Sequence, residues 1–412
     1  MLAILTTHPI QYQVPIWKAL AARGRVPVKV YYMSNQGIVS RHDPGFGRPV
    51  AWDIDLLSGY DHEFLPGIVE RENSSTFFWL RANSNIARRL VEQRATTLWI
   101  QGWQVLAYWQ AVWQAKSEKL TTWLRAESNL SSIDRSWKRY IKDPARRQLF
   151  NRIDRFLCIG EANRCFYEAN GIELDRLVSA PYCVDNSRFE RDATALAGQR
   201  AEIRRKWNIP DKALCVLFVG KLIPKKRPAD LISACQVASH RLGGRHLHLL
   251  FVGAGELIEL LRSQTLVVYD FEHKNFPRNL EAPPSSRQIT ASFAGFLNQS
   301  EIVQAYVAAD CLVLPSEATE TWGLVVNEAM ACGLPAVVSD AVGCCADLVR
   351  PLRPDLCFPV GDIRGLAESL TACLINPPRP EDIRSIIDKY DVLRTVEAVE
   401  ELYRETACNR AA

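Results

Sequence analysis

The stretch 312–338 constrains the fold of this 412-residue chain most, because it predicts two buried strands with a helix between them. The apolar run Cys311–Leu314 suits a parallel strand that is buried on both faces. Apolar side chains at helical spacing then predict a helix over 322–332, which Gly333 is placed to end. A second apolar run, 336–338, predicts the next strand, so the stretch is a strand–helix–strand unit of a parallel sheet.

Two carboxylates lie at the mouth of this unit, Glu320 in the loop before the helix and Glu328 on the helix. The free backbone N–H groups and the dipole at a helix N-terminus attract phosphate. Carboxylates repel phosphate but accept hydrogen bonds from sugar hydroxyls, so the combination fits a nucleotide sugar. The alternative is structural: Glu320 caps the helix, and Glu328 is solvated or pairs with a lysine.

Residues 320–335, ETWGLVVNEAMACGLP, closely resemble the E-x7-E signature of retaining glycosyltransferases of the GT-B fold, family 4 in particular. The family usually has Pro-Phe or Pro-Trp after the first Glu, so Thr321-Trp322 is a mild departure. The resemblance implies that this unit binds the donor. The donor-binding candidates here are Glu320, Thr321, Trp322, Gly323, Leu324 and Glu328.

A basic loop follows the predicted strand 214–219 and begins Gly220-Lys221. Glycine allows close approach of the backbone, and a cluster of lysines suits a diphosphate; a solvated basic turn is the alternative. The loop resembles the family's G-R-L-x-x-x-K motif, with Lys221 in the Arg position and Lys226 in the Lys position. The resemblance implies that both cations hold the donor phosphates, although lysine lacks the bidentate fork of arginine.

Two further segments carry the resemblance. The run 291–297 resembles the family strand whose end lies against the nucleotide base, which makes Phe296 a donor-binding candidate. Residues 179–189 resemble the family's inter-domain segment, with Val184, Asp185 and Phe189 matching.

The length and the alternation of strands and helices predict two doubly wound, Rossmann-like α/β domains with parallel sheets. The resemblance implies that these are the two domains of a GT-B fold facing a central cleft. We expect an acceptor-binding domain over 1–190 and a donor-binding domain over 200–385. The C-terminal helix, about 386–412, is expected to pack back on the first domain, as is common in this fold.

Acceptor-side candidates follow the predicted strand 1–7, because loops at the carboxyl ends of parallel strands carry the ligand. His8, Gln11 and Tyr12 lie in or just after that loop, although a lone histidine could equally make a local hydrogen bond. Similar enzymes often have a glycine-rich loop here, so acceptor recognition is expected to differ.

The predicted strand 120–124 is followed by Arg125 and Glu127, two more residues on the acceptor side. A carboxylate at a strand's carboxyl end could act on a sugar hydroxyl, or it could be a solvated group paired with Arg125. Glu127 stands about where similar enzymes offer a histidine to the transferred sugar. The catalytic candidates are therefore Lys226, Glu320 and Glu127.

No metal or other cofactor is expected. Asp53-Ile54-Asp55 has no supporting pattern for a metal, and the alternating His246 and His248 lack further ligands.

Twelve cysteines without a C-x-x-C pair indicate reduced core cysteines in a cytoplasmic protein. A net charge of only +4 gives no argument for nucleic acid, and no signal peptide or membrane-spanning run is visible.

A basic stretch lies at 130–155, where eight Lys and Arg residues stand against three Asp. Aromatic and aliphatic residues interleave with these charges, at spacings that predict two short helices broken by Asp143-Pro144. Such a pattern suits reversible peripheral contact with an anionic membrane at the inner face of the cell. The alternative is a solvated helix face whose apolar side packs on the domain.

The sequence as a whole predicts a retaining glycosyltransferase that moves a hexose-type sugar from a nucleoside-diphosphate sugar to an acceptor hydroxyl. The acceptor would be a sugar or a lipid-linked glycan in polysaccharide or glycoconjugate biosynthesis. A nucleotide-sugar epimerase of the same fold and a non-catalytic sugar-nucleotide scaffold are the alternatives. The joint presence of Lys226, Glu320 and Glu328 speaks against the scaffold.

Overall fold

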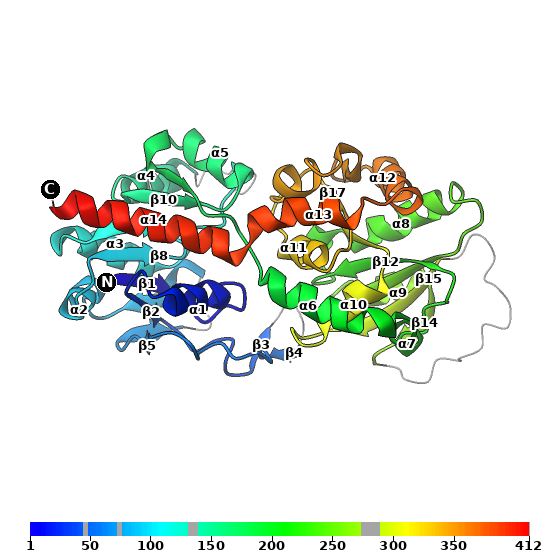
Figure 1. Cartoon of the computed structure of the whole chain (residues 1–412), viewed down its shortest axis with the longest axis horizontal. Coiled ribbons are helices and arrows are strands. Elements are labelled where there is room, and N and C mark those ends of the chain that lie inside the picture. The colour runs from blue at the N-terminus through cyan, green and yellow to red at the C-terminus, as the bar shows by residue number, and fades with distance from the viewer. Residues whose placement is uncertain (44–47, 72–75, 131–138, 273–288, 412) are drawn as a thin grey trace. The chain divides into compact units, whose positions relative to one another are not determined.

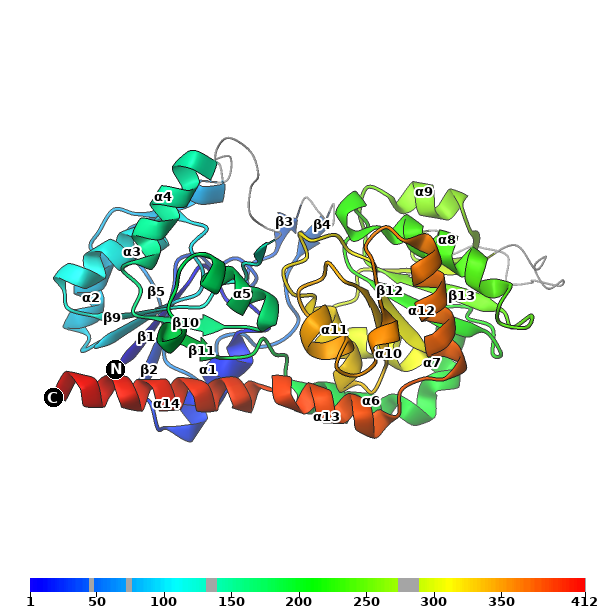
Figure 2. The same ribbon diagram turned by 90° about the horizontal axis from the view of Figure 1, so that it is seen from above.

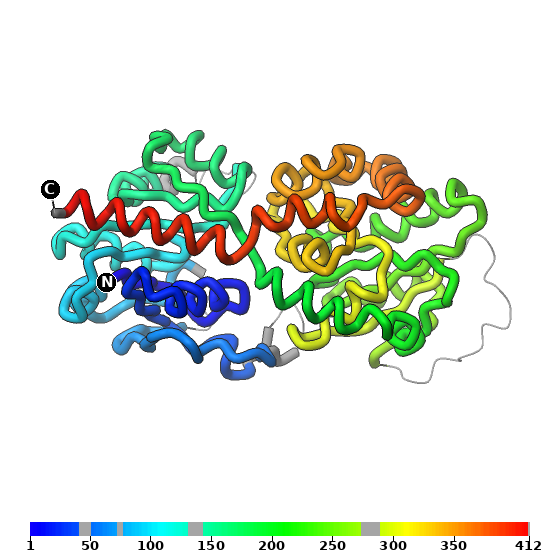
Figure 3. Tube along the Cα trace, viewed as in Figure 1, coloured from blue at the N-terminus to red at the C-terminus, as the bar shows by residue number. Residues whose placement is uncertain are grey.

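The computed structural model describes residues 1–43, 48–71, 76–130, 139–272 and 289–411 (Figure 1). The chain divides into two compact units. Unit 1 comprises 1–41, 55–183 and 391–412, and unit 2 comprises 42–54 and 184–390. The chain passes from unit 1 to unit 2 after Cys183 and returns after Tyr390, a course that Figure 3 lets the reader follow.

Unit 1 is built on a parallel sheet with the strand order β11-β10-β9-β8-β1-β2-β5. Its strands are β1 (Leu2–Thr6), β2 (Val28–Tyr32), β5 (His62–Phe64), β8 (Thr97–Ile100), β9 (Thr121–Leu124), β10 (Arg155–Cys158) and β11 (Leu177–Ser179). Its helices are α1 (Val14–Arg23), α2 (Ile86–Glu92), α3 (Leu106–Ser117), α4 (Arg139–Phe150), α5 (Glu161–Ala169) and α14 (Val392–Ala411). Figure 2 shows α1 and α14 on one face of the sheet and α3 and α4 on the other.

The sheet of unit 2 has the order β14-β15-β13-β12-β16-β17-β18 and is also parallel. Its strands are β12 (Leu214–Val219), β13 (Leu247–Val252), β14 (Leu266–Asp270), β15 (Thr290–Gly295), β16 (Cys311–Leu314), β17 (Ala336–Ser339) and β18 (Cys357–Phe358). Its helices are α6 (Asn186–Leu196), α7 (Arg200–Lys206), α8 (Pro228–Ser239), α9 (Ile258–Ser263), α10 (Ile302–Ala308), α11 (Leu324–Ala331), α12 (Ile363–Ile375) and α13 (Pro380–Ile387). The central strands β12, β13, β15 and β16 are buried along their whole length, as strands covered on both faces require.

Two further sheets have two strands each, one of β3 (Arg41–Asp43) with β4 (Arg48–Val50) and one of the antiparallel pair β6 (Ile68–Glu70) and β7 (Leu80–Ala82). The β4 strand and the residues after it, up to Ile54, belong to unit 2 although they precede most of unit 1 in the sequence. The α14 helix belongs to unit 1, where its Glu400 carboxylate accepts hydrogen bonds from the guanidinium of Arg23 on α1.

Local features set the start of two helices. The α1 helix begins at Val14, because the preceding residues form a turn and Pro15 occupies the first helical turn, where its missing N–H is not needed. The α11 helix begins at Leu324 rather than Trp322, because Gly323 has a left-handed φ of +97°.

The predicted break at Asp143-Pro144 is also wrong, since α4 continues through Pro144. Tertiary packing overrides the proline, because Leu149, Phe150 and Ile153 at and after the C-terminal end of the helix lie in the core of unit 1. These three residues are therefore not available to a membrane surface. They fit the alternative interpretation of the basic stretch, in which the apolar side of the helix packs on the domain. Leu130, at the start of the stretch, is 46% exposed, whereas Trp137, Tyr140 and Ile141 lie where the structure describes no side chains. None of the helices it describes is long and apolar enough to cross a membrane.

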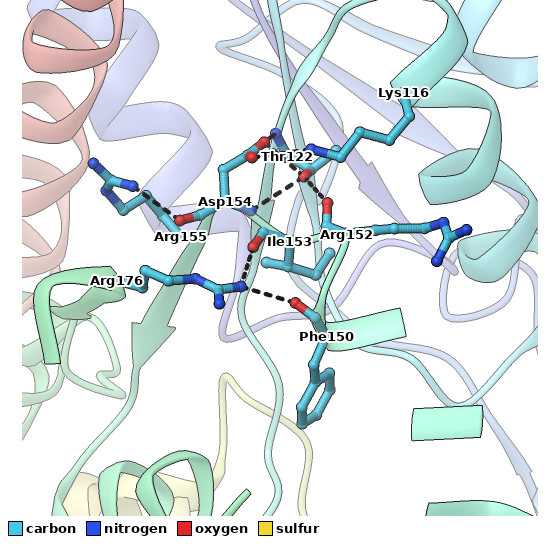
Figure 4. A network of polar contacts seen from close by, with 8 residues as sticks. All are labelled: Lys116, Thr122, Phe150, Arg152, Ile153, Asp154, Arg155 and Arg176. Carbon is cyan, nitrogen blue, oxygen red and sulfur yellow. Dashed lines mark hydrogen bonds and ion pairs between the residues drawn. The ribbon is translucent and has the colours of Figure 1, made fainter. Parts of the chain in front are cut away.

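The turn from α4 into β10 is held by a polar network centred on Asp154 (Figure 4). The Asp154 carboxylate accepts from the backbone N–H of Thr122 at 2.7 Å and from the Lys116 ammonium at 3.1 Å, while the Asp154 N–H donates to the Thr122 carbonyl at 2.8 Å. Arg152 and Arg155 donate to nearby backbone carbonyls. Much of the charge in this part of the basic stretch thus stabilises the connection between β9 and β10.

Replacing Asp154 by Ala should destabilise unit 1, because the backbone N–H of the buried Thr122 loses its carboxylate acceptor. We expect a loss of about 1–3 kcal/mol in the free energy of unfolding, measured by urea denaturation. Lys116→Ala is the matched control, because it removes only the exposed ion pair, a contact of about 0–1 kcal/mol. Equal effects of the two substitutions would contradict this account.

Candidate functional site

Three glycines lie at the carboxyl edge of the unit 2 sheet. Gly220 follows β12, Gly253 follows β13, and Gly295 is the last residue of β15. Gly253 after β13 donates its N–H to the carbonyl of Gly295 on β15 at 2.8 Å, and Gly220 after β12 donates to Val252 at 2.9 Å. A Cβ on Gly253 would lie 1.9 Å from the Gly220 carbonyl oxygen, so side chains are excluded from this contact. Gly220 itself, with a φ of +146°, has open space where its side chain would be. The edge therefore offers bare backbone to a ligand.

The loop after Gly220 brings a buried cation to this edge. The Lys226 ammonium forms an ion pair with the Glu320 carboxylate, and both side chains are more than four-fifths buried. Burial, and then the charges of Lys225 and Lys221, lower the pKa of Lys226 to about 8. The structure thus brings together two of the three predicted catalytic residues from loops 94 positions apart in the sequence.

The loop that carries Glu320 is fixed from two sides by its backbone. Glu317 donates its N–H to the Lys225 carbonyl at 2.9 Å, which joins this loop to the basic loop. On the other side, Gly343 donates to the Glu320 carbonyl at 3.1 Å and Cys344 donates to the Trp322 carbonyl at 3.0 Å. A Cβ on Gly343 would lie 1.8 Å from the Thr321 carbonyl oxygen. Sequence reasoning missed Gly343, because an isolated glycine gives no sign of which backbone it touches.

The side chain of Trp322 points into unit 2 rather than to solvent. It is 2% exposed, its Nε1 donates to the Asn327 side chain at 2.8 Å, and its ring lies 5.8 Å from that of Tyr390. Any donor contact at 321–324 would therefore come from the backbone around Gly323 and from the N-terminus of α11, which begins at Leu324. The donor-binding role of these residues remains a prediction.

Glu328 lies on α11 and is also buried, with 2% of its surface exposed. Its carboxylate accepts a hydrogen bond from the hydroxyl of Tyr306 on α10, and the Gln299 side chain lies 3.5 Å away. Arg188 on α6 in turn binds the side chain of Gln299 at 2.6 Å. These three partners were not found from the sequence, because they come from separate elements and carry no shared motif. They fix the direction of the Glu328 carboxylate, and its role toward a donor remains a prediction.

Unit 1 has its own cavity, of about 370 Å³, at the carboxyl ends of β1, β8, β9 and β10. Its lining residues are Thr7, Ile10, Gln13, Gln101, Gly102, Trp103, Gln104, Arg125, Ala126, Glu127, Ser128, Ile159 and Tyr182. Of the predicted residues of unit 1, Arg125 and Glu127 line this cavity, whereas His8, Gln11 and Tyr12 are not among its lining residues. The glutamines were missed because their positions show no pattern along the sequence.

Arg125 and Glu127 are held by different groups rather than by each other. Arg125 is 3% exposed and donates to the carbonyls of Ala180 and Pro181, at 3.3 and 2.9 Å. Glu127 accepts from the Tyr182 hydroxyl, and burial together with the Glu127 charge raises the pKa of that tyrosine well above its usual value. The Nε of Arg125 and the Nε2 of Gln101 are buried without a hydrogen-bond partner among the described residues. Both residues line the cavity, and a buried donor without a partner is costly unless a ligand or an ordered water binds it.

His8 makes the local hydrogen bond that was the alternative to a site role. Its Nδ1 lies 2.9 Å from the Thr7 hydroxyl, and its ring meets that of Trp79 edge-on. Gln11 is buried and Tyr12 is partly buried. The acceptor-side role of these three residues remains a prediction.

The residues considered for a metal site have separate partners. Asp53 binds Ser300, whereas Asp55 binds the hydroxyl of Ser58 and the ammonium of Lys18. His246 and His248 both contact the Thr290 hydroxyl, each at 2.9 Å. No group of three potential metal ligands occurs in the described parts of the chain.

Gly343→Ala should displace the loop that carries Glu320, because the new methyl group would overlap a backbone carbonyl. We expect a loss of about 1–3 kcal/mol in stability together with weaker binding of nucleoside diphosphates, measured by urea unfolding and calorimetry. Gly198→Ala is the matched control, since a Cβ there meets no atom within 4 Å and needs no left-handed φ. Unchanged binding and stability in Gly343→Ala would show that the contact is not needed.

A family of known proteins resembles this chain mainly in its second half. Residues 199–389 match the family model described as glycosyl transferases group 1. A D-inositol 3-phosphate glycosyltransferase of Saccharomonospora viridis is 28% identical over 60% of this chain and 56% of its own length. A GDP-mannose-dependent alpha-mannosyltransferase of Mycobacterium tuberculosis is 31% identical over 47% of this chain and 41% of its own length. The matches thus span about half the length of these relatives.

Solved structures match along nearly the whole chain. Anabaena HepE in complex with UDP aligns with a TM-score of 0.67 and 15% identity over 98% of this chain and 99% of its own. WaaG, a glycosyltransferase involved in lipopolysaccharide biosynthesis, aligns with a TM-score of 0.60 and 15% identity over 98% and 99%. At this identity the likeness shows the fold, which confirms the predicted pair of Rossmann-like domains. The chain has the GT-B fold, and its residues 199–389 match the family model of the group 1 glycosyl transferases.

Proposed function

We propose that this protein is a retaining glycosyltransferase that moves a hexose-type sugar from a nucleoside-diphosphate sugar to an acceptor hydroxyl. The observation that carries the proposal is the buried Lys226–Glu320 pair beside the bare backbone at Gly220. A cation at this place can bind a phosphate, and a carboxylate next to it can accept hydrogen bonds from a sugar. The names of the relatives, which include a mannosyltransferase dependent on GDP-mannose, support a donor of this class.

On the donor side, the diphosphate would lie between the Gly220 backbone, the N-terminus of α11 and the cations Lys221 and Lys226. When the bond to the sugar breaks, negative charge develops on the leaving diphosphate. Preorganised cations in a partly buried site stabilise that charge more than water does. The donor phosphate would compete with Glu320 for Lys226, which would free the carboxylate to accept a hydrogen bond from a sugar hydroxyl.

On the acceptor side, the cavity of unit 1 is lined mainly by uncharged hydrogen-bonding groups and aromatic rings. Glutamines, hydroxyls, Trp103 and Tyr182 suit a sugar ring, and a volume of about 370 Å³ is sufficient for a small ligand. We infer that the acceptor presents a neutral sugar unit here, either free or at the end of a lipid-linked glycan. Glu127 is the candidate for accepting the proton of the acceptor hydroxyl.

No metal is needed in this proposal, because the cations of the basic loop supply the positive charge at the diphosphate. Turnover that persists in a chelator would support this part. The proposed setting is the cytoplasm, with reversible contact to an anionic membrane through the part of 130–155 that lies before the core residues. A role in polysaccharide or glycoconjugate biosynthesis fits an acceptor of this kind.

Lys226→Ala and Glu320→Ala should each remove most donor turnover, because each breaks the pair on which the proposal rests. We expect losses of about 100-fold or more in kcat, typical of removing one charge-stabilising group. Turnover is measured as release of nucleoside diphosphate from UDP-glucose or GDP-mannose, with product analysis to separate sugar transfer from isomerisation of the donor. The exposed pair at Arg241 and Glu368 supplies the control, Arg241→Ala. Wild-type turnover in either site variant would refute the assignment.

The pH dependence should follow the lowered pKa of Lys226. A lysine with a pKa of about 8 is cationic below that pH and loses its charge above it, so kcat/KM should fall above about pH 8. Lys226→Arg keeps the charge, and whatever activity remains should lose this alkaline decline. Lys225→Gln removes a repelling neighbour, so the decline should move to higher pH. An alkaline decline at the same pH in all three proteins would assign it to another group.

A further inference from the structure

A segment from the first part of the chain lies on unit 2. Residues 42–54 precede most of unit 1 in the sequence but belong to unit 2. The end of the segment is anchored by polar contacts on both sides of Trp52. The Ala51 carbonyl accepts from the Asn298 side chain at 2.8 Å, and the Asp53 carboxylate accepts from the Ser300 N–H at 3.3 Å and from its hydroxyl.

Trp52 is thereby set against Phe296, the first residue after β15. The two ring centroids are 6.2 Å apart and the ring planes are inclined by 46°. Both side chains remain only partly buried. The ring of Phe271 lies 2.7 Å from where a Cβ on Gly295, the residue before Phe296, would be. An aromatic corner therefore stands at the carboxyl end of β15, with surface still open to solvent.

The strand order gives the distance from this aromatic corner to the backbone at Gly220. Gly220 follows β12 and Gly295 ends β15, and β13 is the one strand between them. Neighbouring strands are about 4.8 Å apart, so the two glycines are separated by about 10 Å along the sheet edge. A ribose and its attached phosphates extend over a similar length. A nucleotide whose terminal phosphate lies at Gly220 can thus reach the aromatic corner with its base.

We propose that Trp52 and Phe296 together form the surface on which the base of the donor nucleotide stacks. Residues 51–53 then complete the donor site of unit 2, and Asp53 and Ser300 act as positioning residues for Trp52. The inference rests on the proposed use of a nucleoside-diphosphate donor. Stacking uses the π-face that every base has, so Trp52 should raise the affinity for different nucleotides alike and leave the choice of base to other groups.

The test is isothermal calorimetry of the full chain with UDP, GDP and inorganic pyrophosphate, which lacks a base. Trp52→Ala and Trp52→Leu should bind both nucleotides about 10-fold more weakly than wild type, and pyrophosphate as well as wild type. Trp52→Phe should retain most of the affinity, since it keeps an aromatic face. The leucine variant separates stacking from mere apolar contact, because its side chain is apolar without a ring.

The control is Trp113→Ala, which removes a 38% exposed tryptophan of unit 1 that stacks on Trp109. It should bind all three ligands as wild type does. Asp53→Ala should weaken nucleotide binding in the same direction as Trp52→Ala but less, because the ring is kept and only its anchor is lost. Unchanged nucleotide affinity in Trp52→Ala, or an equal loss for pyrophosphate, would overturn the inference and leave the proposed function standing. A wild-type protein that bound neither nucleotide would refute the proposed function itself.

Discussion

Direct contact of backbone with backbone is the constraint on which the proposed donor site depends. Gly253 meets the Gly220 carbonyl and Gly343 meets the Thr321 carbonyl at distances that no side chain could share. The first contact leaves the carboxyl edge of the sheet bare, and the second fixes the loop that carries Glu320. Because both loops are held by their backbones, the Lys226 and Glu320 side chains are free to respond to a ligand.

The Lys226 ammonium is mostly buried in its ion pair with Glu320, and this burial changes its pKa. Burial makes an ammonium costly, and the charges of Lys225 and Lys221 add to that cost, so the pKa of Lys226 is lowered to about 8 even though Lys226 pairs with Glu320. The same burial strengthens its attraction for a phosphate that replaces water. The site is thus suited to hold an anion more strongly than an exposed lysine would, at the cost of losing its charge in mildly alkaline solution.

The two units differ in how they present polar groups. Unit 2 offers cations and bare backbone, which suit the diphosphate part of many donors. Unit 1 offers a cavity lined mainly by uncharged polar side chains, with Arg125 and Glu127 as its charged members, and such a lining suits the hydroxyl groups of a sugar acceptor. Leu149, Phe150 and Ile153 are packed in the core, so this part of the basic stretch stabilises unit 1. This division fits a family-model match that spans residues 199–389.

The sequence by itself determined the strands at the centres of both sheets, because continuous apolar runs such as 214–219 and 311–314 suit only a strand buried on both faces. It also located Lys226 and Glu320, whose motifs are local and long enough to recognise. The tertiary structure decided what depends on partners distant in the sequence. The Glu328 carboxylate binds the Tyr306 hydroxyl, and Trp52 is part of unit 2. The α4 helix continues through Pro144, because packing against other elements outweighs local propensity. Such contacts leave no periodic trace in the sequence, so only the folded chain shows which residues they unite.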